Sequence, residues 1–173
     1  MASEYRNIRL KEAVTTSHLR LQGITFGAYL CDSINYITEF EDLVTTFKLV
    51  NNYLDPGGIF VFDLKTIELY RSIGESVIAE DREDCSFIWD NYFDEEDCIN
   101  EYMLSIFVKG DDNRYDKFSE EHYQRAYTVE EIKEALNLAG LEFVTVYDAF
   151  TRNEPNSESE RIYVVARECQ KNQ

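Results

Sequence analysis

The sequence predicts an α/β fold that contains one parallel β-α-β crossover, an antiparallel insert and a C-terminal β-hairpin. Three observations support this fold class. A strand-like run, an amphipathic helical segment and a second strand-like run follow one another over residues 24 to 62. Residues 86 to 127 alternate or run aromatic between polar turns, which is typical of an antiparallel meander. Two more strand-like runs follow a helical segment that starts near residue 128.

The crossover begins with "ITFGAYL", residues 24 to 30, a short apolar run that predicts a buried strand. The helix that follows is predicted over residues 38 to 54, with Thr38 as its N-cap. Its apolar residues recur at helical spacing: Phe40, Leu43, Val44, Phe47, Val50 and Leu54. A proline-glycine turn ends this helix, and the next strand is predicted from Ile59 to Phe62. Because a helix connects the two strands, they are expected to be parallel.

The remaining elements are a short helix, the insert, and a final helix with a hairpin. The short helix is predicted over residues 67 to 73. The insert is expected to hold about three antiparallel strands, in "SFIWDNYF", "NEYMLSIFVK" and "FSEEHYQRAY". Thr128 and Glu131 form a capping box for the final helix, and Gly140 ends it. Two strands then follow, in "LEFVTVYDAF" and "ERIYVVAR".

Length and charge restrict the function classes. The chain has 173 residues, which suits one domain, and 34 acidic against 17 basic residues give a formal charge of -17. Nucleic acids and anionic membranes bind clustered Lys and Arg, so neither is expected as a direct partner. The four cysteines are scattered without a CxxC pair, and no metal site is expected. No signal peptide or membrane span is recognised, so we expect a cytoplasmic protein with reduced thiols.

Several separated segments resemble one protein family in their order along the chain. "LCDSINYITEFEDL" and "FKLVNNYLDPGGIFVFDL" are followed by a "W-x-N-x-F" segment at residues 89 to 93, by residues 120 to 127 and by residues 160 to 164. This order is similar to the C-terminal two-thirds of class I S-adenosylmethionine-dependent methyltransferases. The resemblance is to the small bacterial type with an antiparallel insert after the fifth strand. It implies a transferase with S-adenosylmethionine as cofactor and a small-molecule acceptor.

The N-terminal part departs from that family. The family's first strand ends in a glycine-rich turn, D/E-x-G-x-G-x-G, whereas the nearest glycines here are Gly23 and Gly27, without a third. The resemblance therefore implies a partial Rossmann-like methyltransferase sheet that lacks its first strands, and impaired cofactor binding. An unpaired strand edge invites pairing, so we expect a homo-oligomer or a partner chain at residues 24 to 30.

The expected single domain has four parts. An atypical N-terminal segment over residues 1 to 23 precedes a β-α-β core over residues 24 to 75. An antiparallel insert that forms a lid follows over residues 80 to 127, and a final helix with the hairpin over residues 128 to 168.

The resemblance also implies site residues. Those expected beside the cofactor are Glu4, Tyr5, Cys31, Asp32, Ser33 and Asn35. Those expected in catalysis are Tyr36 and Asp63 at the carboxyl ends of the two parallel strands, and Glu121 and His122 on the insert. Those expected to bind substrate are Trp89, Arg125 and Tyr127. Because strand side chains alternate, Glu121 and His122 lie on opposite faces, and only one can face a given pocket.

Structural roles are open alternatives for several of these residues. Residues 32 to 36 could form a turn that caps the next helix, and Asp63 could cap the helix after it. His122 could be a structural strand residue, and Trp89 a packing anchor between sheet and insert.

Three functions remain open: a small-molecule methyltransferase, a non-catalytic remnant that dimerises or binds a partner, and an enzyme completed by another chain. Titration with S-adenosylmethionine distinguishes these functions, because the missing glycine-rich turn predicts weak or undetectable binding.

Overall fold

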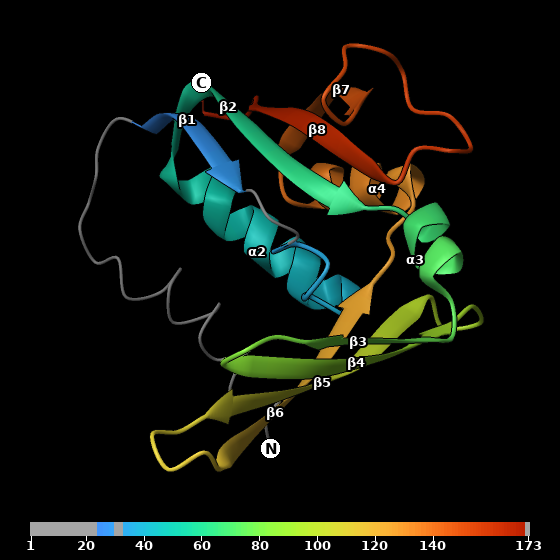
Figure 1. Cartoon of the computed structure of the whole chain (residues 1–173). Coiled ribbons are helices and arrows are strands. Elements are labelled where there is room, and N and C mark those ends of the chain that lie inside the picture. The colour runs from blue at the N-terminus through green and yellow to red at the C-terminus, as the bar shows by residue number, and fades with distance from the viewer. Residues whose placement is uncertain (1–23, 30–32, 172–173) are drawn as a thin grey trace.

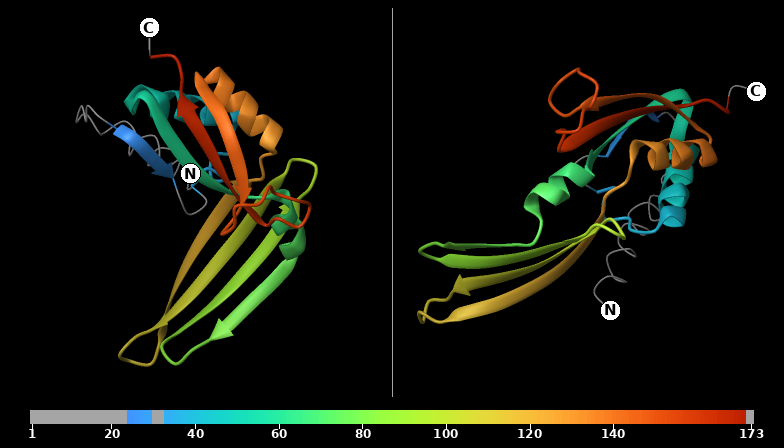
Figure 2. Two further views of the ribbon diagram at one scale, coloured as in Figure 1. Left: turned by 90° about the horizontal axis from the view of Figure 1, so that it is seen from above. Right: turned by 90° about the vertical axis from the view of Figure 1, so that its right-hand side faces the viewer.

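The computed structural model describes residues 24–29 and 33–171, with side chains from residue 33 onward (Figure 1). These residues form two four-stranded sheets, in the orders β1-β2-β8-β7 and β3-β4-β5-β6. Figure 2 shows the second sheet extending away from the body that contains the first. The α/β class and the separate antiparallel insert are therefore confirmed.

The first sheet contains the predicted crossover and hairpin. Strand β1, Ile24–Tyr29, pairs in parallel with β2, Leu54–Lys65. Strand β8, Arg161–Glu168, lies antiparallel between β2 and β7, Leu141–Asp148. Strand β1 is at one edge of this sheet, at the position where the sequence predicts an exposed edge.

Helix α2, Phe40–Tyr53, makes the crossover and starts later than predicted. Its N-cap is Glu39, whose backbone is extended and whose side chain makes no capping hydrogen bond. The prediction of Thr38 as the cap is therefore wrong. The Thr38 carbonyl instead accepts a hydrogen bond from the Arg125 guanidinium, so a tertiary contact outweighs the local capping preference.

The main core lies between the first sheet and the two long helices. Phe47 of α2 packs against Phe60 and Phe62 of β2, with ring centroids 5.7 and 5.1 Å away. Helix α4, Val129–Leu138, adds buried residues to the same cluster and carries the predicted capping box at Thr128. Both helices therefore cover one face of the sheet, as their apolar stripes predict.

The second sheet has four antiparallel strands rather than about three. They are β3, Ser76–Asp81; β4, Cys85–Asp94; β5, Ile99–Lys109; and β6, Tyr115–Arg125. Strand β3, "SVIAED", was not predicted. Five of its six residues are exposed, so its sequence lacks the alternation that marks a half-buried strand.

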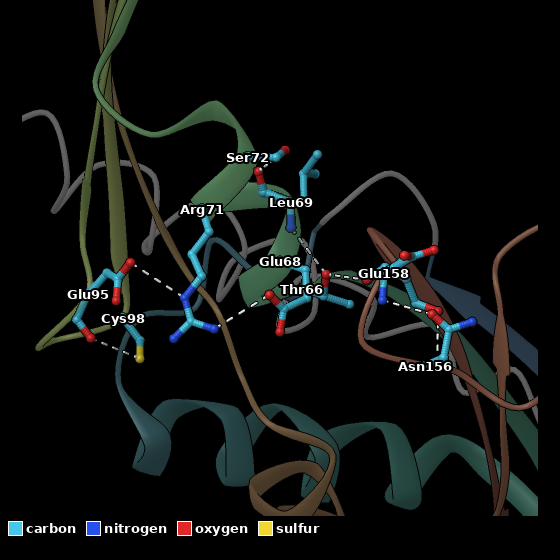
Figure 3. Close-up of polar contacts among 10 residues, drawn as sticks. Thr66, Glu68, Leu69, Arg71, Ser72, Glu95, Cys98, Asn156 and Glu158 are labelled. Carbon is cyan, nitrogen blue, oxygen red and sulfur yellow. Dashed lines mark hydrogen bonds and ion pairs between the residues drawn. The ribbon is translucent and has the colours of Figure 1, made fainter.

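Helix α3, Ile67–Ile73, occupies the predicted range and connects the two sheets (Figure 3). The Thr66 hydroxyl accepts from the Leu69 N–H at 3.4 Å and donates to the Ser159 carbonyl at 2.6 Å. The Arg71 guanidinium lies 3.5 Å from the carboxylate of Glu95, in the turn between β4 and β5. These contacts attach the base of the insert to the loop that precedes β8.

Cys85, Cys98 and Cys169 are free thiols. Within the described residues, no helix combines the length and apolar character that crossing a bilayer requires.

Candidate functional site

A chain of polar contacts connects the loop after β1 with the insert. The Tyr36 hydroxyl lies 2.8 Å from the Tyr102 hydroxyl on β5 and 3.0 Å from Nδ1 of His122 on β6. The other ring nitrogen of His122, Nε2, lies 3.1 Å from a carboxylate oxygen of Glu120. The His122 side chain is only 11% exposed, so these contacts lie largely out of water. Two of the predicted catalytic residues, Tyr36 and His122, are thus in direct contact.

The partners assign the protons in this network. When Glu120 is ionised and His122 is neutral, the carboxylate only accepts hydrogen bonds, so Nε2 of His122 carries the hydrogen. Nδ1 then has a lone pair and accepts from the Tyr36 hydroxyl. The Tyr36 oxygen can in turn accept from Tyr102. This order, carboxylate, imidazole and hydroxyl, leaves His122 able to take up a proton that arrives through Tyr36.

Three aromatic rings stand side by side on the same face of the insert. The His122 and Tyr102 rings stack, with centroids 4.3 Å apart and planes 11° apart. The centroid of the Trp89 ring lies 4.8 Å from that of Tyr102. The register explains the row, because Tyr102 pairs with His122 and Leu104 pairs with Trp89. The row holds the tips of Tyr102 and His122 in position beneath Tyr36.

Asn35 holds the loop that carries Tyr36. Its side chain donates to the carbonyls of Lys65 and Arg125, at 3.0 and 2.9 Å, and accepts from the Lys65 N–H at 2.9 Å. The residue is fully buried. All three contacts are internal to the protein, so the geometry gives Asn35 a positioning role and leaves no side-chain amide hydrogen directed outward for a cofactor.

Arg125 and Tyr127 make contacts within the protein body. The Arg125 guanidinium donates to the Thr38 carbonyl and to the Glu131 carboxylate, at 3.0 and 2.9 Å. The buried Tyr127 hydroxyl donates to the Ile37 carbonyl at 2.6 Å. Burial raises the pKa of this phenol, partly opposed by the Arg125 charge, so it stays protonated. The structure does not bring these two side chains to the Tyr36–His122 contact, and their predicted substrate role remains a prediction.

Asp63 and Glu121 also lie apart from that contact. Asp63 is 3% exposed and forms an ion pair with Arg161 on the neighbouring strand β8. Its other carboxylate oxygen is buried without a hydrogen bond among the described residues. Glu121 is exposed and precedes His122 on β6, so its side chain projects from the opposite face of the insert. A catalytic role for either residue remains a prediction.

The other predicted cofactor residues fall mainly outside the described part of the structure. Glu4, Tyr5, Cys31 and Asp32 are not among the described residues. Ser33 is partly buried and begins the turn that leads to Asn35. Over residues 33–171 and the backbone of 24–29, no glycine-rich turn follows a strand. The Asn35 side chain hydrogen-bonds to the backbone of Lys65 and Arg125.

Two members of the network, Tyr102 and Glu120, are not among the site residues that the sequence predicts. Tyr102 carries no motif, and Glu120 stands beside the equally acidic Glu121. The register of the insert would have identified them, because the strand order β4-β5-β6 places one residue of each strand in a common row. No group of His, Cys, Asp and Glu suited to a metal ion occurs among the residues that the structure describes.

Comparison with curated proteins finds relatives in sequence. The chain is 35% identical over 137 residues to a Bacillus subtilis (strain 168) protein named "Putative methyltransferase YqeM", covering 79% of this chain and 55% of that protein. It is 30% identical over 138 residues to a similarly named Geobacillus protein, covering 79% and 56%. The chain thus spans about half the length of the curated relatives it matches. A comparison with models of known protein families finds no match.

Solved structures share the fold. An S-adenosylmethionine-dependent methyltransferase from Clostridium acetobutylicum ATCC 824 superposes with a TM-score of 0.74 and 28% identity. The superposition covers 86% of this chain and 63% of that one. The sheet β1-β2-β8-β7 is therefore a partial Rossmann-like sheet, and the predicted resemblance is confirmed over this part.

Proposed function

Because the chain shares the sequence and fold of class I S-adenosylmethionine-dependent methyltransferases over part of their length, we propose that it forms the acceptor-facing part of such an enzyme. The acceptor in this proposal is a small molecule. The bound cofactor supplies the activated methyl group, and the residues described here bind the acceptor and move its proton.

The observation that carries the proposal is the contact between Tyr36 and His122. The two residues come from the carboxyl end of the parallel strands and from the insert, the edge at which open α/β sheets bind their ligands. An acceptor that is attacked through an O–H or N–H group loses a proton on methylation. His122 can receive that proton through Tyr36, with Glu120 stabilising the imidazolium.

Charge and enclosure support a small acceptor. The His122 side chain is largely buried, and the Tyr36 hydroxyl of the loop after β1 lies against it. A formal charge of -17 disfavours nucleic acid as a substrate. Both features favour a small-molecule acceptor.

A methyl-transfer assay tests the proposal. The chain is incubated with millimolar S-adenosylmethionine, labelled in the methyl group, and a panel of small phenols, alcohols and amines. We expect slow transfer to at least one acceptor, and a loss of about 100-fold in His122→Asn, the lower range for removal of a general base. Glu134→Gln, which removes one exposed charge on α4, is the control and should transfer at the wild-type rate. Equal rates in wild type and His122→Asn would contradict the role of His122.

Impaired cofactor binding is a separate part of the proposal. It rests on the absence of a D/E-x-G-x-G-x-G turn from the sequence. Calorimetric titration of the chain with S-adenosylmethionine should therefore detect no micromolar binding. A micromolar dissociation constant would overturn this part, and Asp32→Ala would then show whether the loop after β1 contributes.

The second candidate function is a non-catalytic or partner-completed module, and the position of β1 at the edge of the described sheet favours it. Among the described residues, β1 pairs only with β2, so its other edge offers backbone groups to a further strand. Sedimentation at micromolar concentration should then show self-association. If the chain were strictly monomeric and transferred no methyl group, self-association would be excluded. Completion of the enzyme by a different polypeptide would then be the alternative that remains.

A further inference from the structure

The face of the insert turned away from Tyr36 carries an acidic and aromatic hollow. The register sets its composition, because Asp90, Met103 and Glu121 pair across β4, β5 and β6. In the adjacent row on the same face, Tyr92, Glu101 and Tyr123 pair in the same way. The tyrosine and histidine of the proposed site, Tyr102 and His122, project from the other face.

These six side chains surround a cavity of about 200 Å³. The central row, Asn91, Tyr102 and His122, also lines it and lies between the two rows of the register. Pockets for drug-sized ligands span roughly 300 to 1,000 Å³, so this hollow is smaller than such a pocket. Its size suits the end of one long side chain from another polypeptide.

The three carboxylates have no cationic partner among the described residues. Two cationic residues on this face of β6, Arg125 and Lys117, contact other groups. The Arg125 guanidinium pairs with Glu131 at 2.9 Å, and the Lys117 ammonium lies over the Phe107 ring at 5.8 Å from its centroid. Among residues 33–171, no cation therefore balances the negative charges of Asp90, Glu101 and Glu121 around this hollow.

The apolar members of the hollow are unusually open to solvent. Tyr92 is 51% exposed, Met103 48% and Tyr123 38%. Tyrosine rings attract cations over their faces, and the methylene stem of Lys or Arg packs on apolar surface while its head stays polar. Exposed rings next to free carboxylates thus fit both parts of a long cationic side chain.

We propose that this face docks a lysine- or arginine-rich segment of a partner polypeptide, with one cationic side chain seated among Asp90, Glu101 and Glu121. Charge complementarity identifies the partner as basic. A second copy of the chain is disfavoured, because each copy has a formal charge of -17. The surface is opposite the Tyr36–His122 contact, so this docking does not depend on the proposed methyl transfer.

Fluorescence anisotropy with labelled hexalysine and hexaarginine peptides tests the proposal at 50 mM salt. The test variant is Asp90→Asn/Glu101→Gln/Glu121→Gln. The control is Glu134→Gln/Glu142→Gln/Glu154→Gln, which removes three exposed charges outside the insert. We expect the test variant to weaken peptide binding at least 10-fold and the control less than 2-fold. Circular dichroism confirms that both variants keep the wild-type fold.

Three outcomes would overturn the proposal. Equal weakening by both variants would show that the peptides respond only to the overall negative charge, and absence of peptide binding to the wild type would exclude the surface. Spermine provides a further arm. If it bound as tightly as the peptides and lost affinity in the same variant, the hollow would be a site for a small polyamine rather than a docking surface.

Discussion

The Tyr36 hydroxyl lies 3.0 Å from Nδ1 of His122, although 86 positions separate the two residues in the chain. One stands in the loop before α2 and the other on the last strand of the insert. Their contact connects the partial Rossmann-like sheet with the insert and makes a proton route possible. The contact also depends on the tautomer of His122, which NMR can measure.

The first prediction concerns the tautomer of His122. Because Glu120 accepts from Nε2, the neutral ring should carry its hydrogen there and leave Nδ1 unprotonated. Nitrogen NMR shifts of the imidazole, measured at alkaline pH, distinguish the two tautomers. Glu120→Gln should reduce the preference for Nε2–H, since the neutral amide is a weaker acceptor. A ring protonated at Nδ1 in the wild type would contradict the assigned order.

A second prediction concerns Asn35. Replacement by Ala leaves the N–H of Lys65 and the carbonyls of Lys65 and Arg125 without their hydrogen bonds in a buried place. Each lost buried hydrogen bond costs about 1 kcal/mol or more, so the free energy of unfolding should fall by about 3 kcal/mol. Urea denaturation measures this. Asn153→Ala, in the exposed loop before β8, should change stability by less than about 0.5 kcal/mol.

Glu168 predicts a pH dependence of stability. Burial by itself raises the pKa of this carboxyl, but the N–H groups of Gly57, Gln170 and Lys171 outweigh burial and hold the pKa below its ordinary value of 4.5. A carboxyl with a lowered folded pKa contributes stability above its ordinary pKa, and the contribution is lost as pH falls through the folded value. Stability should therefore decline as the pH falls below about 4.5.

Glu168→Gln tests that dependence. The variant should be less stable than the wild type at pH 7 and should approach it at acidic pH, because the wild type then loses the same charge. Denaturant unfolding at a series of pH values measures the difference. Glu134→Gln, on the exposed face of α4, is the matched control and should not change the acid slope. If the unfolding free energies of wild type and Glu168→Gln fell in parallel with pH, Glu168 would not be the cause of the acid dependence.

Gly140 supports a fourth prediction. Its φ of +75° is in the left-handed region, and an added Cβ would approach the Gln170 side chain to 2.6 Å and the Asn51 amide nitrogen to 3.0 Å. Gly140→Ala should lower the unfolding free energy by about 1 to 2 kcal/mol. Gly110→Ala is the control, since its φ is not positive and its closest contact is 3.3 Å. Urea denaturation should show a clearly smaller change there.

Local signals in the sequence were enough to predict most of the helices and strands. Helix α3 occurs over the predicted residues 67 to 73, and the capping box of α4 occurs at Thr128 as predicted, because caps and periodic apolar residues act over one or two turns. The start of α2 was misplaced, since the capping preference of Thr38 was overridden by a contact with Arg125, 87 positions away. Strand β3 was missed because an exposed edge strand lacks periodicity.

The amino-acid sequence by itself determined the α/β class, the parallel crossover, the insert and the family resemblance, because these follow from local periodicity and from segment order. Only the tertiary structure decided which acidic and aromatic residues act together. Glu120 and Glu121 are neighbours of equal charge, yet one faces His122 and the other faces the hollow beside Met103. The alternation of a strand separates them, and the register against β5 decides which side chains each one meets.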